Sequence, residues 1–274
     1  MCAPVTGAQQ IRDLVAADTV LMPGVYDALT ARIAARVGFD IVFISGYSVS
    51  AARLGEPDFG FLTQTEIADA ARAVCRASSA PVIVDADTGY GSPVNVLRTV
   101  RDFQDAGAAG VFLEDQVWPK KCGHFRGKEV VPTAEHAARI RAAADARGER
   151  DLFIVARTDA RQPLGPESEE ELAEIARRLP PPLVANMIER GRTPHLSREE
   201  LRALGFGLIV CPLAALYAAA KAVTEVLSQL RQEGTTAALY ERMLTFDEFG
   251  DLVGLEQRYA DEARYASAGT TEPL

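Results

Sequence analysis

Short runs of apolar residues, rich in β-branched side chains, recur along the chain and alternate with longer stretches of helical period. The runs cover residues 19–22, 41–44, 82–84, 110–113, 152–156, 183–186 and 208–211. Their apolar residues follow one another without polar interruption, which is typical of parallel strands that helices cover on both faces. In a chain of 274 residues, a repeat of roughly 25 to 40 residues favours an α/β fold of the TIM type, a (β/α) barrel, over an open doubly wound sheet.

The pattern changes after residue 213, where the sequence becomes helical without further strands. It predicts helices over residues 214–230 and 236–249, and it ends in the polar segment ASAGTTEPL. We interpret residues 1–274 as one barrel domain, with the barrel at about 10–212 and a C-terminal helical extension at about 213–265. The apolar faces of the extension could pack on the barrel or on another subunit.

Composition and charge exclude several classes of protein. The chain has 29 Lys and Arg against 38 Asp and Glu, a net charge of -9, and no dense basic run, so nucleic acid is not an expected partner. No apolar stretch reaches the roughly 18 to 20 residues that span a bilayer, and the N-terminus lacks the pattern of a signal peptide. We therefore expect a cytoplasmic protein that does not bind membranes.

Polar and charged residues follow the predicted strands at their carboxyl ends. They are Ser45, Gly46, Tyr47, Asp85, Asp87, Glu114, Arg157 and Asn186. In a barrel these ends converge on one mouth, and on a strand residues two apart point to the same side. Three carboxylates, Asp85, Asp87 and Glu114, would repel each other there, and Mg²⁺ with oxygen ligands would relieve the repulsion. The alternative is that the aspartates cap the helices that follow.

The segment WPKKCGHFRGKEVVPT places a cysteine among cationic residues in a glycine-containing loop after the fourth strand. Cationic neighbours lower the pKa of a thiol, so Cys122 would exchange a proton near neutral pH. The four cysteines form no CxxC pair, which disfavours a disulfide framework and a thiolate zinc site. The alternative interpretation is a solvated basic loop with an incidental cysteine.

The segments GVYDALTARIAARVGFD, SGYSVSA, VDADTGYG, FLEDQ, PKKCGH, ARTDA and NMIERGRTP together resemble the isocitrate lyase and phosphoenolpyruvate mutase superfamily. The resemblance runs from about residue 10 to residue 225. Its KKCGH loop is similar to that of the carbon–carbon lyase branch, whose members cleave 2-methylisocitrate, 2,3-dimethylmalate or oxaloacetate. Phosphonate mutases and oxaloacetate decarboxylases resemble this scaffold without that cysteine, so the resemblance implies a lyase.

The resemblance also implies roles for individual residues. Asp85 would bind Mg²⁺, or Mn²⁺ in its place, while Asp87 and Glu114 would hold its waters. The implied substrate-binding residues are Ser45, Gly46, Tyr47, Asp58, Gly123, Arg157 and Asn186, and the implied catalytic residues are Cys122, Tyr47, Lys120 and His124. The expected partner is a small carboxylate: a 2-hydroxy acid would lose its hydroxyl proton, with Tyr47 as base, and Cys122 would protonate the carbanion that cleavage leaves.

Two other functions stay open at this point. One is a hydrolase that splits oxaloacetate into oxalate and acetate. The other is a non-catalytic barrel, because the resemblance implies two βα units between Arg157 and Asn186 and the sequence RQPLGPESEEELAEIARRLPPP has room for one helix. The sixth βα unit, with a strand that ends in a glutamate, is thus missing, and barrel closure couples strand number to tilt and shear.

The missing strand leads to an expectation about assembly. Seven strands would leave unpaired backbone groups on the strands that end at Arg157 and Asn186, with the gap partly closed by a shifted neighbouring strand. The C-terminal helices carry more apolar surface than a closing helix needs, and the resemblance implies subunits that exchange such helices. We therefore expect a homo-oligomer, a dimer of dimers.

Overall fold

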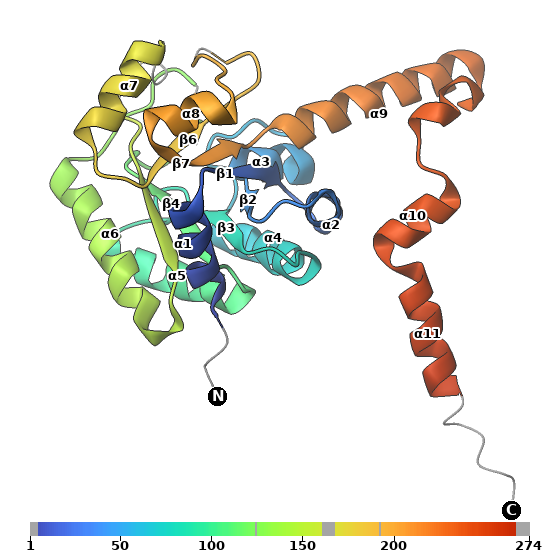
Figure 1. Cartoon of the computed structure of the whole chain (residues 1–274), viewed down its shortest axis with the longest axis horizontal. Helices are drawn as coiled ribbons and strands as arrows, with labels where there is room; N and C mark the ends of the chain where they lie inside the picture. The colour runs from blue at the N-terminus through green and yellow to red at the C-terminus, as the bar shows by residue number, and fades with distance from the viewer. Residues whose placement is uncertain (1–4, 124, 161–167, 192, 267–274) are drawn as a thin grey trace, which may run out of the picture. The chain divides into compact units, whose positions relative to one another are not determined.

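The structure is a computed structural model that describes residues 5–123, 125–160, 168–191 and 193–266. Its central feature is one curled sheet of seven parallel strands (Figure 1). The strands are β1 (Val20–Val25), β2 (Val42–Ile44), β3 (Val82–Asp85), β4 (Gly110–Glu114), β5 (Phe153–Arg157), β6 (Leu183–Asn186) and β7 (Phe206–Cys211), in the spatial order β5-β4-β3-β2-β1-β7-β6. The α/β class and all seven predicted strands are confirmed.

The sheet does not close into a full barrel. In the described part of the chain, β5 pairs with β4 and β6 pairs with β7, so these two strands form the edges of a half-barrel. The neighbouring strand β4 is buried along its whole length, whereas Ala156 in β5 and Asn186 in β6 are exposed. The predicted gap is therefore present between the two expected strands, but the expectation that a shifted neighbouring strand partly closes it was wrong.

Helices lie before the first strand, between successive strands and after the last strand. They are α1 (Gly7–Ala17), α2 (Ala28–Val37), α3 (Gly46–Leu54), α4 (Gln64–Ala77), α5 (Pro93–Ala106), α6 (Thr133–Arg147), α7 (Glu169–Arg178), α8 (Arg198–Leu204), α9 (Ala214–Glu233), α10 (Phe246–Val253) and α11 (Leu255–Ala266), with 3₁₀ turns at Gly148–Arg150 and Ala237–Arg242. Helix α5 shows how the sequence sets their limits: Pro93 occupies its first turn, and Gly107 ends it with a left-handed backbone.

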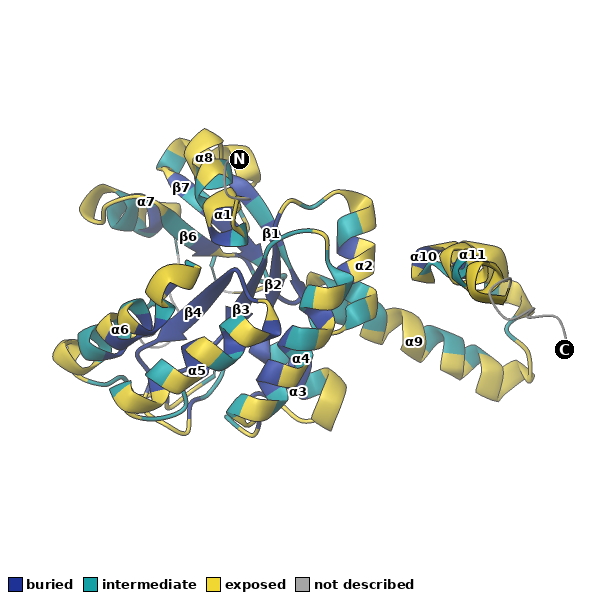
Figure 2. Cartoon of the chain, turned by 90° about the horizontal axis from the view of Figure 1, so that it is seen from below, coloured by how far each residue is buried: buried dark blue, intermediate teal, exposed yellow. Residues whose placement is uncertain are grey.

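Two layers of apolar side chains hold the sheet in place. The outer layer packs the strands against α2, α4, α5 and α6 and includes Phe103, which is fully buried. The inner layer lies on the concave face, where Met22, Ile83 and Leu208 meet Ile11 of α1. Figure 2 shows the strands buried and the outward sides of the covering helices exposed. Because the core fills the concave face, the mouth at the carboxyl ends of the strands is the place left for a site.

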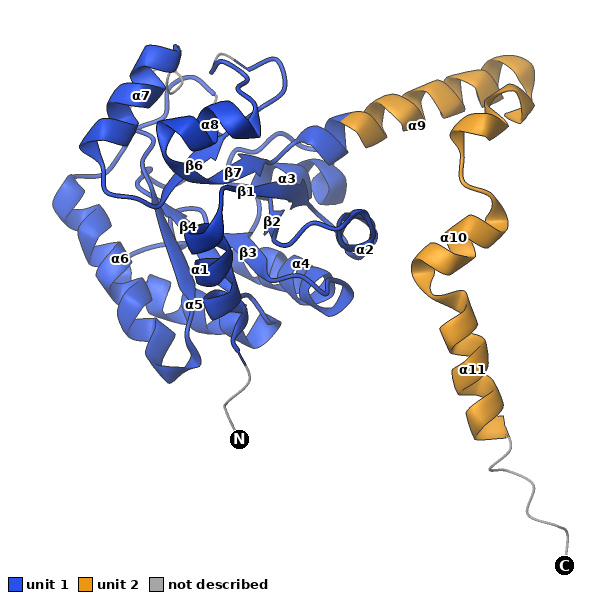
Figure 3. Ribbon diagram, in the orientation of Figure 1, with its two compact units in different colours: residues 1–217 blue, residues 218–274 orange. Residues whose placement is uncertain are grey.

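The C-terminal part differs in detail from its prediction. The chain divides into two compact units, residues 1–217 and 218–274, and α9 begins in the first and continues into the second (Figure 3). The prediction of one helix over residues 236–249 was wrong, because a 3₁₀ turn occupies Ala237–Arg242 and α10 begins only at Phe246. Thr245 caps α10 through a reciprocal capping box with Glu248, which starts a new helix there.

None of the described helices combines the length and apolar character that a bilayer-crossing segment needs. The cytoplasmic location and the exclusion of nucleic acid stay predictions.

Candidate active site

The carboxyl end of β3 carries two of the predicted metal-site residues. The Asp85 carboxylate accepts hydrogen bonds from the backbone N–H groups of Gly46 at 3.3 Å and Asp87 at 3.2 Å. Asp87 follows with a positive φ of 48°, a left-handed conformation that aspartate tolerates better than most residues. Both side chains are buried. The strand end thus turns sharply and presents two carboxylates to the mouth.

Lys120 joins this strand end to a distant loop. Its buried Nζ lies 2.5 Å from Asp87 Oδ1 and donates a 2.7 Å hydrogen bond to Asp58 Oδ2. Burial alone would lower the pKa of Lys120, but Asp87 and Asp58 together raise it well above its ordinary value. Burial raises the pKa of Asp87 to about 7 despite the nearby Lys120. Removing one partner of a buried ion pair is costly, because the other charge is then left unpaired in the interior. The contacts of Lys120 with Asp58 and Asp87 therefore fix the Cys122 loop to the mouth.

A second group of charges lies at the ends of β4 and β5. Arg157 Nη1 is 3.3 Å from Glu114 Oε2, and Arg157 Nη2 donates to Asp159 Oδ1 at 3.1 Å. Burial raises the pKa of Glu114 in spite of Arg157 and Lys120. Burial alone would also raise the pKa of Asp159, but Arg157, a hydrogen bond from Gln116 and Lys128 together hold it well below its ordinary value. Arg157 is the one of these side chains that remains partly exposed, so it can reach a ligand.

The Cys122 loop crosses the mouth next to these charges. The backbone N–H of Cys122 donates to the carbonyl of Asp58 at 2.9 Å, and a Cβ placed on Gly123 would lie 2.4 Å from Arg157 Nη2. A larger residue at position 123 would require the Arg157 and Asp159 side chains to move. The Cys122 thiol belongs to no disulfide and is partly exposed. The loop therefore places the backbone of Gly123 against Arg157, directly after the residue that carries the thiol.

Aromatic side chains line one side of the same loop. Phe125 lies 6.2 Å from the Tyr47 ring and 5.1 Å from the Phe59 ring, measured between ring centroids. Burial, Tyr47 and Cys122 raise the pKa of Tyr217, at the start of α9, to about 12. We call Tyr47, Phe59 and Phe125 the aromatic wall. It gives the mouth an apolar surface beside the Cys122 loop.

The structure brings most of the predicted site residues to this mouth. Ser45, Gly46, Tyr47, Asp58, Asp85, Asp87, Glu114, Lys120, Cys122, Gly123 and Arg157 all lie at the carboxyl ends of β2 to β5 or on the loops that follow them. Ser45 caps α3 by accepting a hydrogen bond from Ser48 N–H at 3.3 Å. Asn186 ends the edge strand β6 and is exposed. His124 lies outside the described residues.

Several residues that the sequence analysis did not single out also lie at the mouth, among them Gln116, Phe59, Phe125 and Tyr217. Gln116 comes two residues after Glu114, the last residue of β4, and side chains two apart on a strand point to the same side. This spacing could have indicated Gln116 as a site residue. Tyr217 follows the last strand closely, in the first turn of α9. Phe59 and Phe125 come from two loops that are remote in sequence, and no pattern in the sequence predicts that they come into contact.

The charges at the mouth fit a divalent cation. Asp58, Asp85, Asp87, Glu114 and Asp159 gather there with the cations Lys120, Lys128 and Arg157, which leaves two negative charges in excess if all are ionised. Among the residues that the structure describes, none is a hydrogen-bond partner of the buried Glu114 Oε1. The described residues contain no three His, Cys, Asp or Glu side chains that converge as direct ligands. The donor set thus fits an ion that keeps most of its waters, as Mg²⁺ does.

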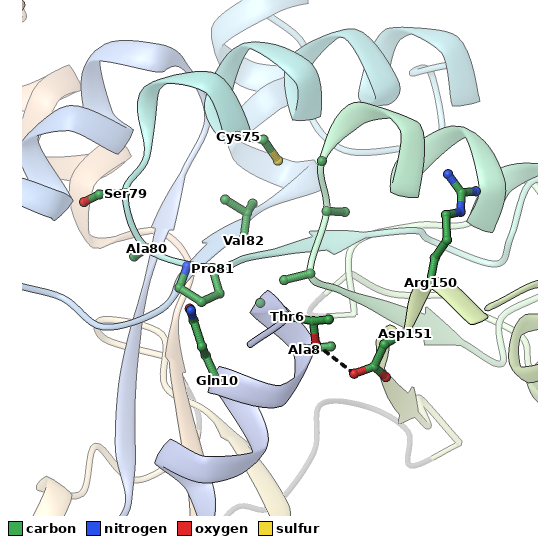
Figure 4. A pocket seen from close by; sticks show the side chains of 14 residues that line it. Thr6, Ala8, Gln10, Cys75, Ser79, Ala80, Pro81, Val82, Arg150 and Asp151 are labelled. Atoms are coloured by element: carbon green, nitrogen blue, oxygen red, sulfur yellow. Dashed lines mark hydrogen bonds between the residues drawn. The ribbon is translucent and has the colours of Figure 1, made fainter. Parts of the chain in front are cut away.

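A separate pocket of about 270 Å³ lies at the opposite, amino-terminal end of the sheet (Figure 4). Residues that precede β3, β4 and β5 line it, among them Pro81, Ala108 and Asp151. Asp151 in this pocket accepts a hydrogen bond from Thr6 at 2.9 Å. The pocket holds none of the carboxylates or cations of the mouth, so we do not assign the active site to it.

Comparisons with known proteins identify the family of this chain. The phosphoenolpyruvate phosphomutase family model matches residues 11–163, more than half of the chain. The chain is 48% identical to a chloroplastic carboxyvinyl-carboxyphosphonate phosphorylmutase of Arabidopsis thaliana, over 92% of this chain and 84% of that protein. It is 43% identical to 2,3-dimethylmalate lyase of Eubacterium barkeri, over 95% of this chain and 98% of that protein.

Solved structures give the same result. A structure of oxaloacetate acetylhydrolase with the inhibitor 3,3-difluorooxalacetate superimposes with a TM-score of 0.88 at 33% identity, covering 99% of this chain and 100% of that one. A structure of phosphonopyruvate hydrolase with oxalate and Mg²⁺ gives a TM-score of 0.83 at 26% identity, covering 95% and 99% of the two chains. The chain therefore belongs to the phosphoenolpyruvate mutase and isocitrate lyase superfamily, and it is an enzyme of that superfamily.

Proposed function

We propose that this enzyme is a Mg²⁺-dependent carbon–carbon lyase that cleaves a small, branched 2-hydroxy di- or tricarboxylate of the 2,3-dimethylmalate or 2-methylisocitrate type. The observation that carries the proposal is the position of the Cys122 loop, which Lys120 fastens to Asp58 and Asp87. The loop carries the Cys122 thiol, and its next residue, Gly123, packs against the Arg157 guanidinium, which is paired with Glu114. A proton donor next to a metal-binding cluster is what carbanion chemistry needs.

Asp85 is the proposed direct metal ligand, and Asp87 and Glu114 would hold its waters. When bound, Mg²⁺, or Mn²⁺ in its place, would lower the pKa of the substrate's 2-hydroxyl group and balance the excess negative charge. The Asp85 carboxylate is already oriented by the backbone N–H groups of Gly46 and Asp87, so it needs no rearrangement to bind. Pre-oriented ligands of this kind reduce the cost of binding the ion.

Arg157 and the start of α3 would bind the carboxylates of the substrate. Arg157 is partly exposed and offers a planar set of N–H donors. Helix α3 begins at Gly46, and its N-terminal N–H groups favour a negative group. Gly123 lets its backbone approach Arg157, and Asn186 would contribute from the edge strand β6. The negative charges of the substrate would thus be bound by Arg157 on one side of the mouth and by the start of α3 on another.

The proton steps fall to Tyr47 and Cys122. Tyr47 is the proposed base for the 2-hydroxyl proton, and Tyr217 interacts with its side chain. Breaking the C2–C3 bond turns C2 into the carbonyl of a 2-oxo acid and leaves the electron pair on C3, next to a carboxylate. The Cys122 thiol gives its proton to C3, and solvent returns a proton to the sulfur. One proton leaves and one is added, so the reaction is balanced.

The aromatic wall supports a substrate with an alkyl branch. Phe125 and Phe59 offer carbon surface beside Cys122, where a methyl or methylene group of the substrate would lie. Oxaloacetate has no such branch. Hydrolysis of oxaloacetate to oxalate and acetate is the second candidate, favoured by the likeness to oxaloacetate acetylhydrolase over 99% of this chain. We do not retain the non-catalytic alternative, because the residues for the chemistry lie together despite the missing strand.

A substrate panel tests the proposal. With Mg²⁺ present, we expect kcat/KM for 2,3-dimethylmalate or 2-methylisocitrate to exceed that for isocitrate and oxaloacetate by at least about tenfold, since one buried methyl group is worth about 1 to 3 kcal/mol. Chelator should abolish turnover with each of them. Release of 2-oxo acid and of oxalate measures the two reactions separately. Oxalate formed from oxaloacetate as the fastest reaction would instead establish the second candidate.

We also propose that the protein is a homo-oligomer, a dimer of dimers. Large apolar side chains of α9 and the following helices are exposed in the single chain, including Leu227, Tyr240 and Phe246, the last at 84%. Exposed apolar surface of this kind marks an interface. Light scattering should give about four times the 29.5 kDa of one chain. A stable species of about 30 kDa at micromolar concentration would refute the assembly.

A further inference from the structure

We infer that Lys128 and Gln116 are positioning residues that hold the Gly123 backbone and the Arg157 guanidinium in one fixed arrangement, with Asp159 as their common partner. The inference rests on the proposed function, since it assigns these residues to the substrate-binding side of that site. It concerns three side chains that would not themselves touch the substrate, and all three are buried.

Lys128 connects the loop to the end of β5. Its Nζ donates a 2.7 Å hydrogen bond to the carbonyl of Gly123 and lies 3.5 Å from Asp159 Oδ1. Only 4% of Lys128 is exposed, so its ammonium group has little access to water. A buried ammonium group is costly unless it is paired, and here its partners include the carbonyl of Gly123 and the Asp159 carboxylate. Lys128 thus ties the position of Gly123 to Asp159.

Gln116 makes the same connection from the other side. Its Nε2 donates to Asp159 Oδ2 at 2.9 Å and to the carbonyl of Lys121 at 2.8 Å, while its Oε1 accepts from Lys121 N–H at 3.1 Å. The amide therefore pairs with both backbone groups of the residue just before Cys122. Arg139 donates to the carbonyl of Gln116 at 3.1 Å and fixes its backbone.

Asp159 joins these contacts to Arg157. Its Oδ1 accepts from Arg157 Nη2 at 3.1 Å, and its own backbone N–H donates to Asp115 at 2.8 Å. Arg157 is also paired with Glu114. Without the positive charge of Lys128, Asp159 and Glu114 would both be balanced mainly by Arg157. The guanidinium would then be less available to the carboxylate of the substrate.

The contact at Gly123 makes the arrangement sensitive to small movements. A Cβ on Gly123 would lie 2.4 Å from Arg157 Nη2 and 2.7 Å from Asp159 Oδ1, so loop and guanidinium are packed against each other. Displacement of a reacting group by about 1 Å can cost about 100-fold in rate. Loss of Lys128 or Gln116 should therefore weaken substrate binding and also misplace Cys122.

The test uses Lys128→Met and Gln116→Leu in the full-length enzyme, with the substrate that the panel identifies. We expect each to lower kcat/KM by about 30- to 100-fold, with KM raised at least tenfold. Lys121→Met is the matched control. Lys121 Nζ lies in the same loop and donates to the carbonyl of Gly127 at 3.1 Å, without contact to Asp159, so the change should stay within about twofold.

A double variant distinguishes a direct interaction between Lys128 and Asp159 from an unspecific loss of structure. Asp159→Asn removes the charge that Lys128 balances, so Lys128→Met with Asp159→Asn should cost clearly less than the product of the two single effects. Independent effects that simply multiply would contradict the inference. So would a loss in kcat alone with KM unchanged, because Arg157 would then bind substrate as before.

Trypsin gives a readout that needs no turnover. Arg126 is exposed in the loop, and cleavage after it should be faster in Lys128→Met and Gln116→Leu than in Lys121→Met, while cleavage after arginines outside the loop is unchanged. Equal cleavage of the three variants would overturn the inference. If the wild-type enzyme cleaves no acid in the panel, the proposed function fails, and the trypsin comparison still decides the positioning role. Should Lys128→Met fail to fold, Gln116→Leu supplies the same comparison.

Discussion

Cys122→Ser is expected to lower kcat for carbon–carbon cleavage by at least about 1,000-fold. A thiol has a pKa of about 8.5 that nearby cations lower further, whereas a serine hydroxyl is a far weaker acid. General acid catalysis by a positioned side chain is worth about 100- to 10,000-fold, and here the acid protonates carbon. Release of 2-oxo acid with Mg²⁺ and the best substrate of the panel measures the effect.

Cys75→Ser is the matched control for this change. Cys75 lies in α4, where burial raises its pKa to about 11, and it lines the pocket at the opposite end of the sheet. Its replacement should leave the rate within about twofold. If Cys122→Ser keeps more than about a tenth of the wild-type rate, Cys122 is not the general acid, and the lyase assignment loses its main chemical argument.

Asp85→Ala is expected to abolish metal-dependent turnover, by more than about 1,000-fold, while the fold remains intact. Asp85 is the proposed direct ligand, and without it the remaining carboxylates are engaged with Lys120 and Arg157. Removing one negative charge from a cluster with excess carboxylates relieves repulsion, so Tm without metal should not fall by more than a few degrees. Activity and Mg²⁺ affinity are measured together by kinetics and calorimetry.

Asp69→Ala provides the comparison on the surface. Asp69 lies on α4 with about half of its side chain exposed, and its partner is Arg72 of the same helix. Its loss should affect neither metal binding nor rate, because exposed pairs of this kind are worth little. Activity of Asp85→Ala near the wild-type value at saturating Mg²⁺ would remove Asp85 from the metal site.

Most of the fold could be predicted from the pattern of strands, because buried parallel strands consist of uninterrupted apolar runs. It failed where backbone geometry overrides that pattern. Strand β1 continues through Pro23 and Gly24 to Val25, beyond the predicted end at residue 22. Proline and glycine normally mark the end of a strand, yet a Cβ on Gly24 would lie 2.1 Å from the carbonyl oxygen of Pro212, so close backbone packing requires glycine there.

The candidate site could be predicted only as far as strand ends are visible in sequence. Asp85, Glu114 and Arg157 are the last residues of their strands, as expected. The partners that fix them come from loops: Lys120 reaches Asp58 across 62 positions of sequence. Such a contact depends on how two loops fold over the mouth, which neither periodicity nor local propensity encodes.

The central claim is cleavage of a carbon–carbon bond with protonation of the resulting carbanion, and NMR of the reaction in D₂O tests it most directly. With 2,3-dimethylmalate and Mg²⁺, pyruvate and propionate should form in equal amounts, and propionate should carry one deuterium at C2, delivered through the exchangeable Cys122 thiol. Chelator should stop both products, and Cys122→Ser should nearly do so. Propionate without deuterium, or no cleavage of any branched acid while oxaloacetate yields oxalate, would contradict the account.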